Sequence, residues 1–440
     1  MLQDDWVSRA APRILILTAS VGEGHDRPAR TLAAQLREEC PDVEIVTEDG
    51  LAAMGRIVST IGESAPGVVF YKFQWLWDLG FWFFAGFGPS RRGTQALLER
   101  VGGGRLLRLI ERTRPDAIVS VYPATTEVLA RLRGKGRIRV PVLAAITDLS
   151  ALRYWAAPGA DVHLLTHPES EEEVRAITGG ATVVQAVHGL TGPEFARPRS
   201  RTDARAELGL PADGKIVLVS GGGWGVGDVE GMIDVALANG DVAQVVCLCG
   251  RNDELRKRID ERFGHLRVRA EGFTEQMGDW MAAADALIHS TGGLTILEAH
   301  IRGCPAISFG WGRGHIRMNN AAFRRYGLAD VAVGPAELRA ALDRALAEQK
   351  AEDMSFAALP SAASVVLEYA GSGGGQNGRR PGDHDERRDQ NGAAERRPAP
   401  VLAADERGKG DRNADLHHDD NRADHARGEA AQRGHLREQP

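Results

Sequence analysis

The amino-acid sequence predicts an α/β protein with two tandem domains, each built on a parallel sheet, followed by a disordered tail. Short apolar runs rich in β-branched residues alternate with amphipathic helical segments, which is the pattern of a parallel sheet covered on both faces. The alternation lapses in a Pro- and Arg-rich connector near residue 200 and then begins again. The chain of 440 residues is long enough for two or three domains.

The first series predicts six strands, at residues 13–19, 42–50, 116–123, 140–148, 161–168 and 182–189, with a helix at 27–40. The second series predicts strands at 215–223, 242–250, 266–272, 286–293 and 305–312, with helices at 253–264 and 294–303. Two terminal helices are expected at 336–349 and 361–370. We therefore expect two Rossmann-like domains, residues 1–200 and 201–370, that face each other across a cleft.

The last segment, residues 371–440, changes character. It is rich in Gly, Arg, Asp and His and has almost no apolar residues. Such a composition buries too little apolar surface to offset the entropy of ordering, so we expect a disordered tail.

Composition narrows the class of protein. The apolar share of 43%, the charged share of 26% and the net charge of −6 are ordinary for a soluble protein and do not indicate a nucleic-acid partner. The four cysteines have no metal-ligand spacing, and they favour a reducing, cytoplasmic compartment. The acidic N-terminus is unlike a signal peptide, and no apolar run is long enough to predict a transmembrane helix.

An aromatic segment, "VVFYKFQWLWDLGFWFFAGFGPSRRG" at residues 68–93, is unusual. It holds three of the 8 Trp and half of the 12 Phe, and Arg91 and Arg92 follow at its end. Trp and Phe favour the bilayer interface, and Arg is attracted to anionic headgroups. We therefore expect Phe70–Phe87 to contact an anionic membrane surface. A loop folded over the first domain or a dimer contact is the alternative.

Two glycine-rich segments of the second domain predict a nucleotide site. In "VSGGGWGVGDVEGM", glycines allow close backbone approach to a ligand, and the following helix N-terminus favours a diphosphate. The segment lacks the Gly-Lys-Ser/Thr of an ATPase P-loop. In "HSTGGLTILEAHIRGCP", Glu298 follows Gly292 and Gly293 on a helix, where a carboxylate can accept hydrogen bonds from ribose hydroxyls. The simpler interpretations are a tight turn and a solvated glutamate.

The segment "CGRN…EGFTEQMGDWMAAADALIHSTGGLTILEA…GCP" resembles the C-terminal domain of the diacylglycerol sugar transferases, which include monogalactosyl- and glucosyldiacylglycerol synthases. The peptidoglycan-precursor N-acetylglucosaminyltransferase is a more distant relative. In the first half, "LTASVGEGHDRPA", "PDAIVSVYPATTEVLARLRGKG", "PVLAAITDLSALRYWAAPGAD" and "THPESEEEV" follow the order of the diacylglycerol branch. The similarity covers residues 13–335 and excludes the tail.

The resemblance implies a GT-B fold, a UDP-sugar donor in the second domain, and inversion at the anomeric carbon with no essential metal and no further cofactor. It implies that the acceptor enters from the first domain. It places the uracil base near Phe273, the ribose at Glu298, and the diphosphate at Gly222, Gly223 and Gly225, with Gly292 and Gly293 nearby. Where many members have a Pro-Gly-Gln-Glu type segment that meets the sugar, this chain has His315, Arg317 and Asn319 or Asn320. Many members also have a His where this chain has Leu152, so the sequence does not choose the sugar.

His25 is the predicted catalytic base. It lies on the turn after the first strand, at the carboxyl edge where open α/β sheets bind ligands, and imidazole accepts protons near neutral pH. Asp148, at the end of "AAITD", is the rival base or the group that orients the acceptor. Asp26 is a candidate N-cap, and Arg251, with Arg313 or Arg317, is a candidate partner of the leaving diphosphate.

The predicted function is transfer of a hexose from a UDP-sugar to diacylglycerol or a related lipid, at the inner face of the plasma membrane. A polyprenyl-linked or other acceptor is the alternative within the same class. An enzyme like the UDP-N-acetylglucosamine 2-epimerase, which shares the two-domain fold, is the alternative from a different class of enzyme. A non-catalytic nucleotide-sugar or lipid-binding module is the alternative without any reaction.

Overall fold

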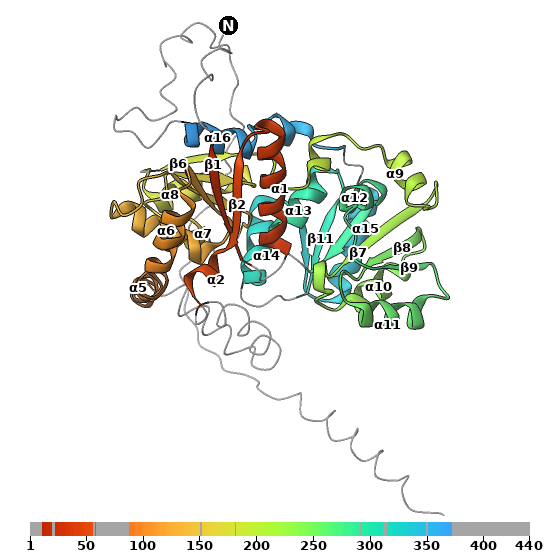
Figure 1. Ribbon diagram of the computed structural model, residues 1–440. Helices are drawn as coiled ribbons and strands as arrows, with labels where there is room; N and C mark the ends of the chain where they lie inside the picture. The colour runs from red at the N-terminus through yellow and green to blue at the C-terminus, as the bar shows by residue number, and fades with distance from the viewer. Residues whose placement is uncertain are drawn as a thin grey trace, which may run out of the picture. The chain divides into compact units, whose positions relative to one another are not determined.

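The structure is a computed structural model, and it describes residues 11–371 apart from 20–22, 56–57, 59–87, 150–151, 181, 291, 311–314 and 349–350. Phe70–Phe87 and the tail after residue 371 therefore lie outside the described residues. The described chain contains two six-stranded sheets, and all of their strand pairs are parallel. Figure 1 shows both sheets with helices around them. The predicted α/β class with two parallel sheets is confirmed.

The first sheet has the strand order β2-β1-β3-β4-β5-β6. Its strands are β1 (Arg13–Thr18), β2 (Glu44–Asp49), β3 (Ala117–Ser120), β4 (Val142–Ile146), β5 (Val162–Leu165) and β6 (Val183–Ala186). Its helices are α1 (Glu23–Glu39), α2 (Gly50–Met54), α5 (Gly88–Thr113), α6 (Pro123–Gly134), α7 (Leu152–Trp155) and α8 (Glu171–Thr178). Buried side chains of β1 alternate between two apolar clusters, Ile14 and Ile16 in one and Leu15 and Leu17 in the other, so both faces of this strand are covered.

The second sheet has the order β12-β11-β10-β7-β8-β9. Its strands are β7 (Lys215–Ser220), β8 (Val242–Leu248), β9 (Val268–Glu271), β10 (Ala286–His289), β11 (Ala306–Phe309) and β12 (Asp330–Ala332). Its helices are α9 (Arg201–Glu207), α10 (Val229–Leu237), α11 (Asp253–Phe263), α12 (Met277–Ala283), α13 (Gly293–Ile301), α14 (His315–Tyr326) and α15 (Pro335–Ala347), and α16 (Ala362–Gly371) follows them in the chain. The strand β12 was not predicted, because it has only 3 residues.

Each sheet has a point where the direction of strand addition reverses. In the second sheet, β7 and β10 are neighbours, and β8 and β11 continue outward on opposite sides. In the first sheet, β1 lies between β2 and β3. Ligands of open α/β sheets bind at the carboxyl ends of strands at such points. The segment with His25 follows β1, and the loop with Gly222 follows β7.

The last described helix does not pack in chain order. We expected both terminal helices in the second domain, and α15 does pack in the core of the second sheet. In contrast, α16 packs against α1 and β3, and its Val365 and Val366 are buried with Ile14 and Ile16. The chain therefore returns to the first sheet before residue 371.

The connector between the sheets is held by Arg302, whose guanidinium is nearly buried. Arg302 donates to the carbonyl oxygens of Glu194 and Arg197 at 2.7 and 2.8 Å. It also pairs with Glu352 at 2.7 Å. These contacts fix the backbone at Glu194. Among the described residues, no helix combines the length and apolar character needed to cross a bilayer.

Candidate active site

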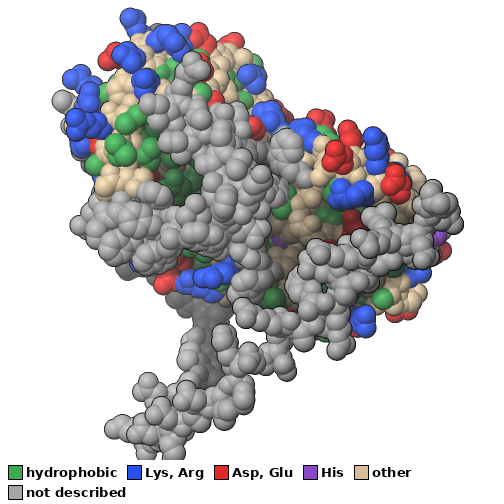
Figure 2. Space-filling view, turned by 90° about the horizontal axis from the view of Figure 1, so that it is seen from below, with side chains coloured by type: hydrophobic (Ala, Val, Ile, Leu, Met, Phe, Trp, Pro, Cys, Tyr) green, Lys and Arg blue, Asp and Glu red, His purple; other side chains and the backbone are tan. Residues whose placement is uncertain are grey.

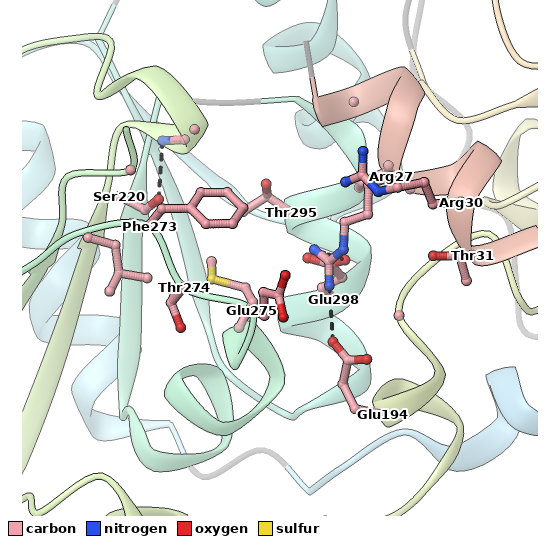
Figure 3. Close-up of a pocket in the computed structure, with 18 of the residues that line it drawn as sticks. Arg27, Arg30, Thr31, Glu194, Ser220, Phe273, Thr274, Glu275, Thr295 and Glu298 are labelled. Carbon is pink, nitrogen blue, oxygen red and sulfur yellow. Dashed lines mark hydrogen bonds and ion pairs between the residues drawn. The ribbon is translucent and has the colours of Figure 1, made fainter. Parts of the chain in front are cut away.

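A cavity of about 430 Å³ opens at the carboxyl edge of the second sheet and is bounded on its other side by α1 of the first half (Figure 3). Residues after β7, β8 and β9 form one wall, and the first turns of α13 form the floor. The lining residues are Gly24, Arg27, Arg30, Thr31, Gly192, Pro193, Glu194, Ser220, Gly222, Gly223, Leu248, Gly250, Gly272, Phe273, Thr274, Glu275, Met277, Leu294, Thr295 and Glu298.

The glycine loop after β7 forms part of the wall through its backbone. The amide of Gly222 donates to Ser220 Oγ at 3.2 Å, and the carbonyl of Gly223 accepts from the amide of Arg251 at 2.8 Å. A Cβ atom at Gly250 would lie 2.5 Å from the Gly223 oxygen, and the φ of Gly250 is +60°. The loop therefore requires glycine at position 250 as well as in its own sequence.

Phe273 lines the cavity after the end of β9, and 45% of its surface is exposed. The guanidinium carbon of Arg251 lies 3.9 Å from the centre of its ring, which is a cation–π contact. An exposed aromatic ring at the end of β9 offers a stacking surface for a planar base. Arg251 approaches the cavity through this ring but is not among the residues that line it.

Glu298 lies on the second turn of α13 and is almost completely buried. Its Oε1 atom is 3.0 Å from Nη1 of Arg27, which comes from α1. Burial raises the pKa of Glu298 to about 7, Arg27 opposes that shift, and the carboxylate of Glu194 adds to it. The predicted ribose-binding residue thus lines the cavity, but it already holds a partner from the other half of the chain.

His25 lies near the beginning of α1, beside the segment that follows β3 and beside helix α7. Its Nδ1 atom is 3.1 Å from the carbonyl oxygen of Val121. Its ring meets Tyr122 edge to face, with centroids 4.9 Å apart, and lies 5.7 Å from Trp155. Because a carbonyl oxygen only accepts hydrogen bonds, Nδ1 carries the proton, and the neutral ring has its lone pair on Nε2. Gly24, the residue before it, lines the cavity.

Asp148 and His167, at the ends of β4 and β5, approach the start of α13. A Cβ atom at Gly293 would lie 3.2 Å from Asp148 Oδ1 and 3.3 Å from His167 Nε2. His167 is buried, and burial lowers its pKa to about 4, so the ring is neutral at pH 7. No local sequence pattern singles out His167, because its position beside Gly293 depends on how the two halves meet.

Other predicted site residues lie outside the cavity lining. Asn320 accepts from Ser308 Oγ at 2.7 Å and donates to the Gly310 carbonyl at 3.4 Å, so it fixes the end of β11. Gly225 has a φ of +62°, and a Cβ atom there would lie 2.5 Å from Leu255 Cδ2. His315 begins α14, and nothing about its side chain is described. Within the described residues, no cluster of His, Cys, Asp and Glu has the makings of a metal site.

Arg27 and Glu194 are two charged cavity residues to which the sequence pattern assigns no role. Arg27 also reaches Glu194, with Nη2 3.0 Å from Oε1. The sequence carries only a weak signal for the role of Arg27, namely a charged side chain two positions after His25. Glu194 lies in "GPEFARP", which the pattern predicts only as a connector.

Two family models match this chain. Residues 25–183 match the family described as monogalactosyldiacylglycerol (MGDG) synthase, and residues 217–366 match the glycosyltransferase family 28 C-terminal domain. The first match contains His25 and Asp148, and the second contains the glycine loop and Glu298.

Curated relatives and solved structures extend the similarity. Two proteins of Staphylococcus aureus, from strains MRSA252 and Newman, are named processive diacylglycerol beta-glucosyltransferase. Each is 26% identical over 330 residues, covering 74% of this chain and 82% of the relative. Among solved structures, the glycosyltransferase SnogD from Streptomyces nogalater has a TM-score of 0.51 at 18% identity, covering 83% of this chain and 100% of its own. Os79 from O. sativa has a TM-score of 0.50 at 13% identity, covering 82% and 99%. These two structures support the GT-B fold.

Proposed function

We propose that this chain, a glycosyltransferase of the monogalactosyldiacylglycerol synthase family with a family 28 C-terminal domain, transfers a hexose from a UDP-sugar to diacylglycerol at a membrane surface. The curated relatives, named as diacylglycerol glucosyltransferases, support this acceptor. Glucose and galactose are the candidate sugars.

The observation that carries the donor assignment is the composition of the cavity. It combines an exposed aromatic ring, a glycine-rich turn, the first turns of a helix and a buried carboxylate, in Phe273, Gly222–Gly223, Thr295 and Glu298. Those are the groups that would stack a base, approach a diphosphate with backbone amides and accept ribose hydroxyls.

The proposed reaction is a single displacement at the anomeric carbon. The acceptor oxygen forms the new bond to C1 while the bond from C1 to the diphosphate oxygen breaks, which inverts the configuration. The acceptor proton goes to Nε2 of His25, whose tautomer is set by the bond from Nδ1 to Val121. The electron pair leaves on UDP, where amides of the glycine loop and of α13 would stabilise the charge.

The acceptor is lipid, so the site must work at a bilayer. Helix α5, which follows the aromatic segment, exposes Arg100, Arg108 and Arg112. Glu111 is exposed on the same helix, and Arg112 lies 3.6 Å from Glu48. Figure 2 shows Lys and Arg side chains gathered beside hydrophobic ones, on the side of the molecule where Figure 1 draws α5. Such a surface supports attachment to anionic lipid.

The decisive experiment incubates the purified protein with vesicles that contain diacylglycerol and with UDP-glucose, UDP-galactose or UDP-N-acetylglucosamine in turn. We expect a monohexosyl diacylglycerol, identified by mass, from one of the first two donors. In a parallel assay with a polyprenyl-linked acceptor in place of diacylglycerol, a product formed only there would contradict the diacylglycerol assignment. Conversion of UDP-N-acetylglucosamine without any acceptor would indicate an epimerase.

A further inference from the structure

Arg27 reaches from α1 into the donor cavity and holds two carboxylates at once. Its Nη1 atom is 3.0 Å from Glu298 Oε1, and its Nη2 atom is 3.0 Å from Glu194 Oε1. Its side chain is 29% exposed, so it also faces the open cavity. Figure 3 shows Arg27 lying across the cavity from Phe273 and Thr274. The guanidinium of Arg27 thus links α1, which carries His25, to Glu194 of the connector and to Glu298 of α13.

Arg27 binds the carboxylate of Glu298, which is the same group that would accept hydrogen bonds from the ribose of the donor. Only 4% of the Glu298 side chain is exposed, and burial keeps its pKa raised in spite of Arg27. The ion pair therefore compensates only part of the cost of removing this carboxylate from water. Two neighbouring ribose hydroxyls would offer Glu298 two donors, and they would compete for the oxygen that Arg27 now contacts.

The charges of the cavity favour a new partner for Arg27 when a donor enters. The lining contains three carboxylates, Glu194, Glu275 and Glu298, and two guanidinium groups, Arg27 and Arg30. A nucleoside diphosphate adds negative charge next to the ribose. A guanidinium has five N–H donors in a planar fork, so it can keep one anion on one edge and bind another on the other edge.

We propose that Arg27 is a diphosphate-binding residue: it pairs with Glu298 as the structure shows, and it binds the donor's phosphates instead when the ribose hydroxyls bind Glu298. The Nη2 atom of Arg27 stays in contact with Glu194 during this exchange. Because Arg27 and His25 belong to the same helix, the phosphate contact of Arg27 would also tie α1 to the donor. The inference rests on the proposed function and adds to it a phosphate ligand from the first half of the chain.

The test compares UDP with uridine, which differ only in the diphosphate. Both are titrated, by calorimetry or ligand-observed NMR, against the wild type, Arg27→Ala, Arg27→Lys and Arg37→Ala. Arg37 is exposed on the same helix outside the cavity, so it controls for the loss of one positive charge. We expect Arg27→Ala to weaken UDP binding about tenfold or more and to change uridine binding by less than about twofold. Arg27→Lys should lose less, because it keeps the charge without the fork, and Arg37→Ala should bind both ligands like the wild type.

Equal losses of UDP and uridine in Arg27→Ala would overturn the inference, because Arg27 would then act only by ordering Glu298. Unchanged UDP binding would overturn it as well. If thermal melting shows that Arg27→Ala does not fold, the same comparison in Arg27→Lys decides, and a selective loss of UDP is required there. A wild type that binds neither ligand would contradict the donor assignment of the proposed function itself.

Discussion

Gly293 and Asp148 meet where the first turn of α13 touches the end of β4, and a Cβ atom at position 293 would lie 3.2 Å from Asp148 Oδ1. That distance is shorter than an ordinary contact between side chains, so the glycine permits the approach. Gly293, which is predicted to lie near the diphosphate, is therefore next to Asp148, which is predicted to lie near the acceptor.

The first prediction follows from this contact. In Gly293→Ala, the new methyl group has to displace Asp148 or His167 by a few tenths of an ångström. We expect destabilisation of about 1–3 kcal/mol, and a loss of turnover larger than that loss of stability explains. Thermal melting and steady-state rates provide the measurements. Gly240→Ala is the matched control, since a Cβ atom there has nothing within 4 Å. Wild-type rates in folded Gly293→Ala would contradict a role for this approach in catalysis.

The second prediction concerns the base. Replacing His25 by Ala removes both the proposed proton acceptor and the bond to Val121. We expect kcat to fall by about 10²–10⁴, with UDP affinity little changed, because general-base catalysis contributes on that scale. His265→Ala, an exposed histidine of the second half, should keep full activity. Near-normal turnover by a folded His25→Ala protein would exclude His25 as the base and would favour Asp148.

The third prediction is a pH dependence of stability. The pKa of Glu298 is about 7 in the folded protein and near the ordinary 4.5 in the unfolded chain. Between these values the folded state binds more protons than the unfolded state, so this group makes stability fall as the pH rises from about 4.5 to about 7. We expect Glu298→Gln to show a flatter profile in that window, measured by denaturant unfolding at several pH values. Arg27 and Glu194 are present in both proteins, which makes the two profiles comparable. Parallel profiles would mean that Glu298 does not titrate there.

The fourth prediction tests the aromatic segment, which lies outside the described residues. Changing Trp75, Trp77 and Trp82 to Ser should release the protein from anionic vesicles in a sedimentation assay and leave its melting temperature unchanged. The physical reason is that Trp partitions to the bilayer interface. Unchanged sedimentation with vesicles would show that the segment does not mediate attachment.

Much of the fold was predictable because buried parallel strands leave a strong local signal. Runs such as "RILILT" and "KIVLVS" are apolar on both faces, and each follows or precedes an amphipathic helix. The three-residue strand β12 and the return of α16 to the first sheet were not predictable. The former is too short to show a period, and the latter depends on contacts between residues more than 300 positions apart, such as Ser361 and Glu39.

By itself, the sequence determined the two α/β halves, the glycine turns and the residue types of the site, since strand patterns and turn chemistry act over a few residues. His25 and Glu298 follow from such local patterns, and Phe273 follows from the resemblance to the diacylglycerol sugar transferases. Only the tertiary structure decided the partners of these residues. Arg27 and Glu194 join Glu298 because α1, the connector and α13 converge at one cavity. That convergence depends on the topology of two sheets, and no local pattern encodes it.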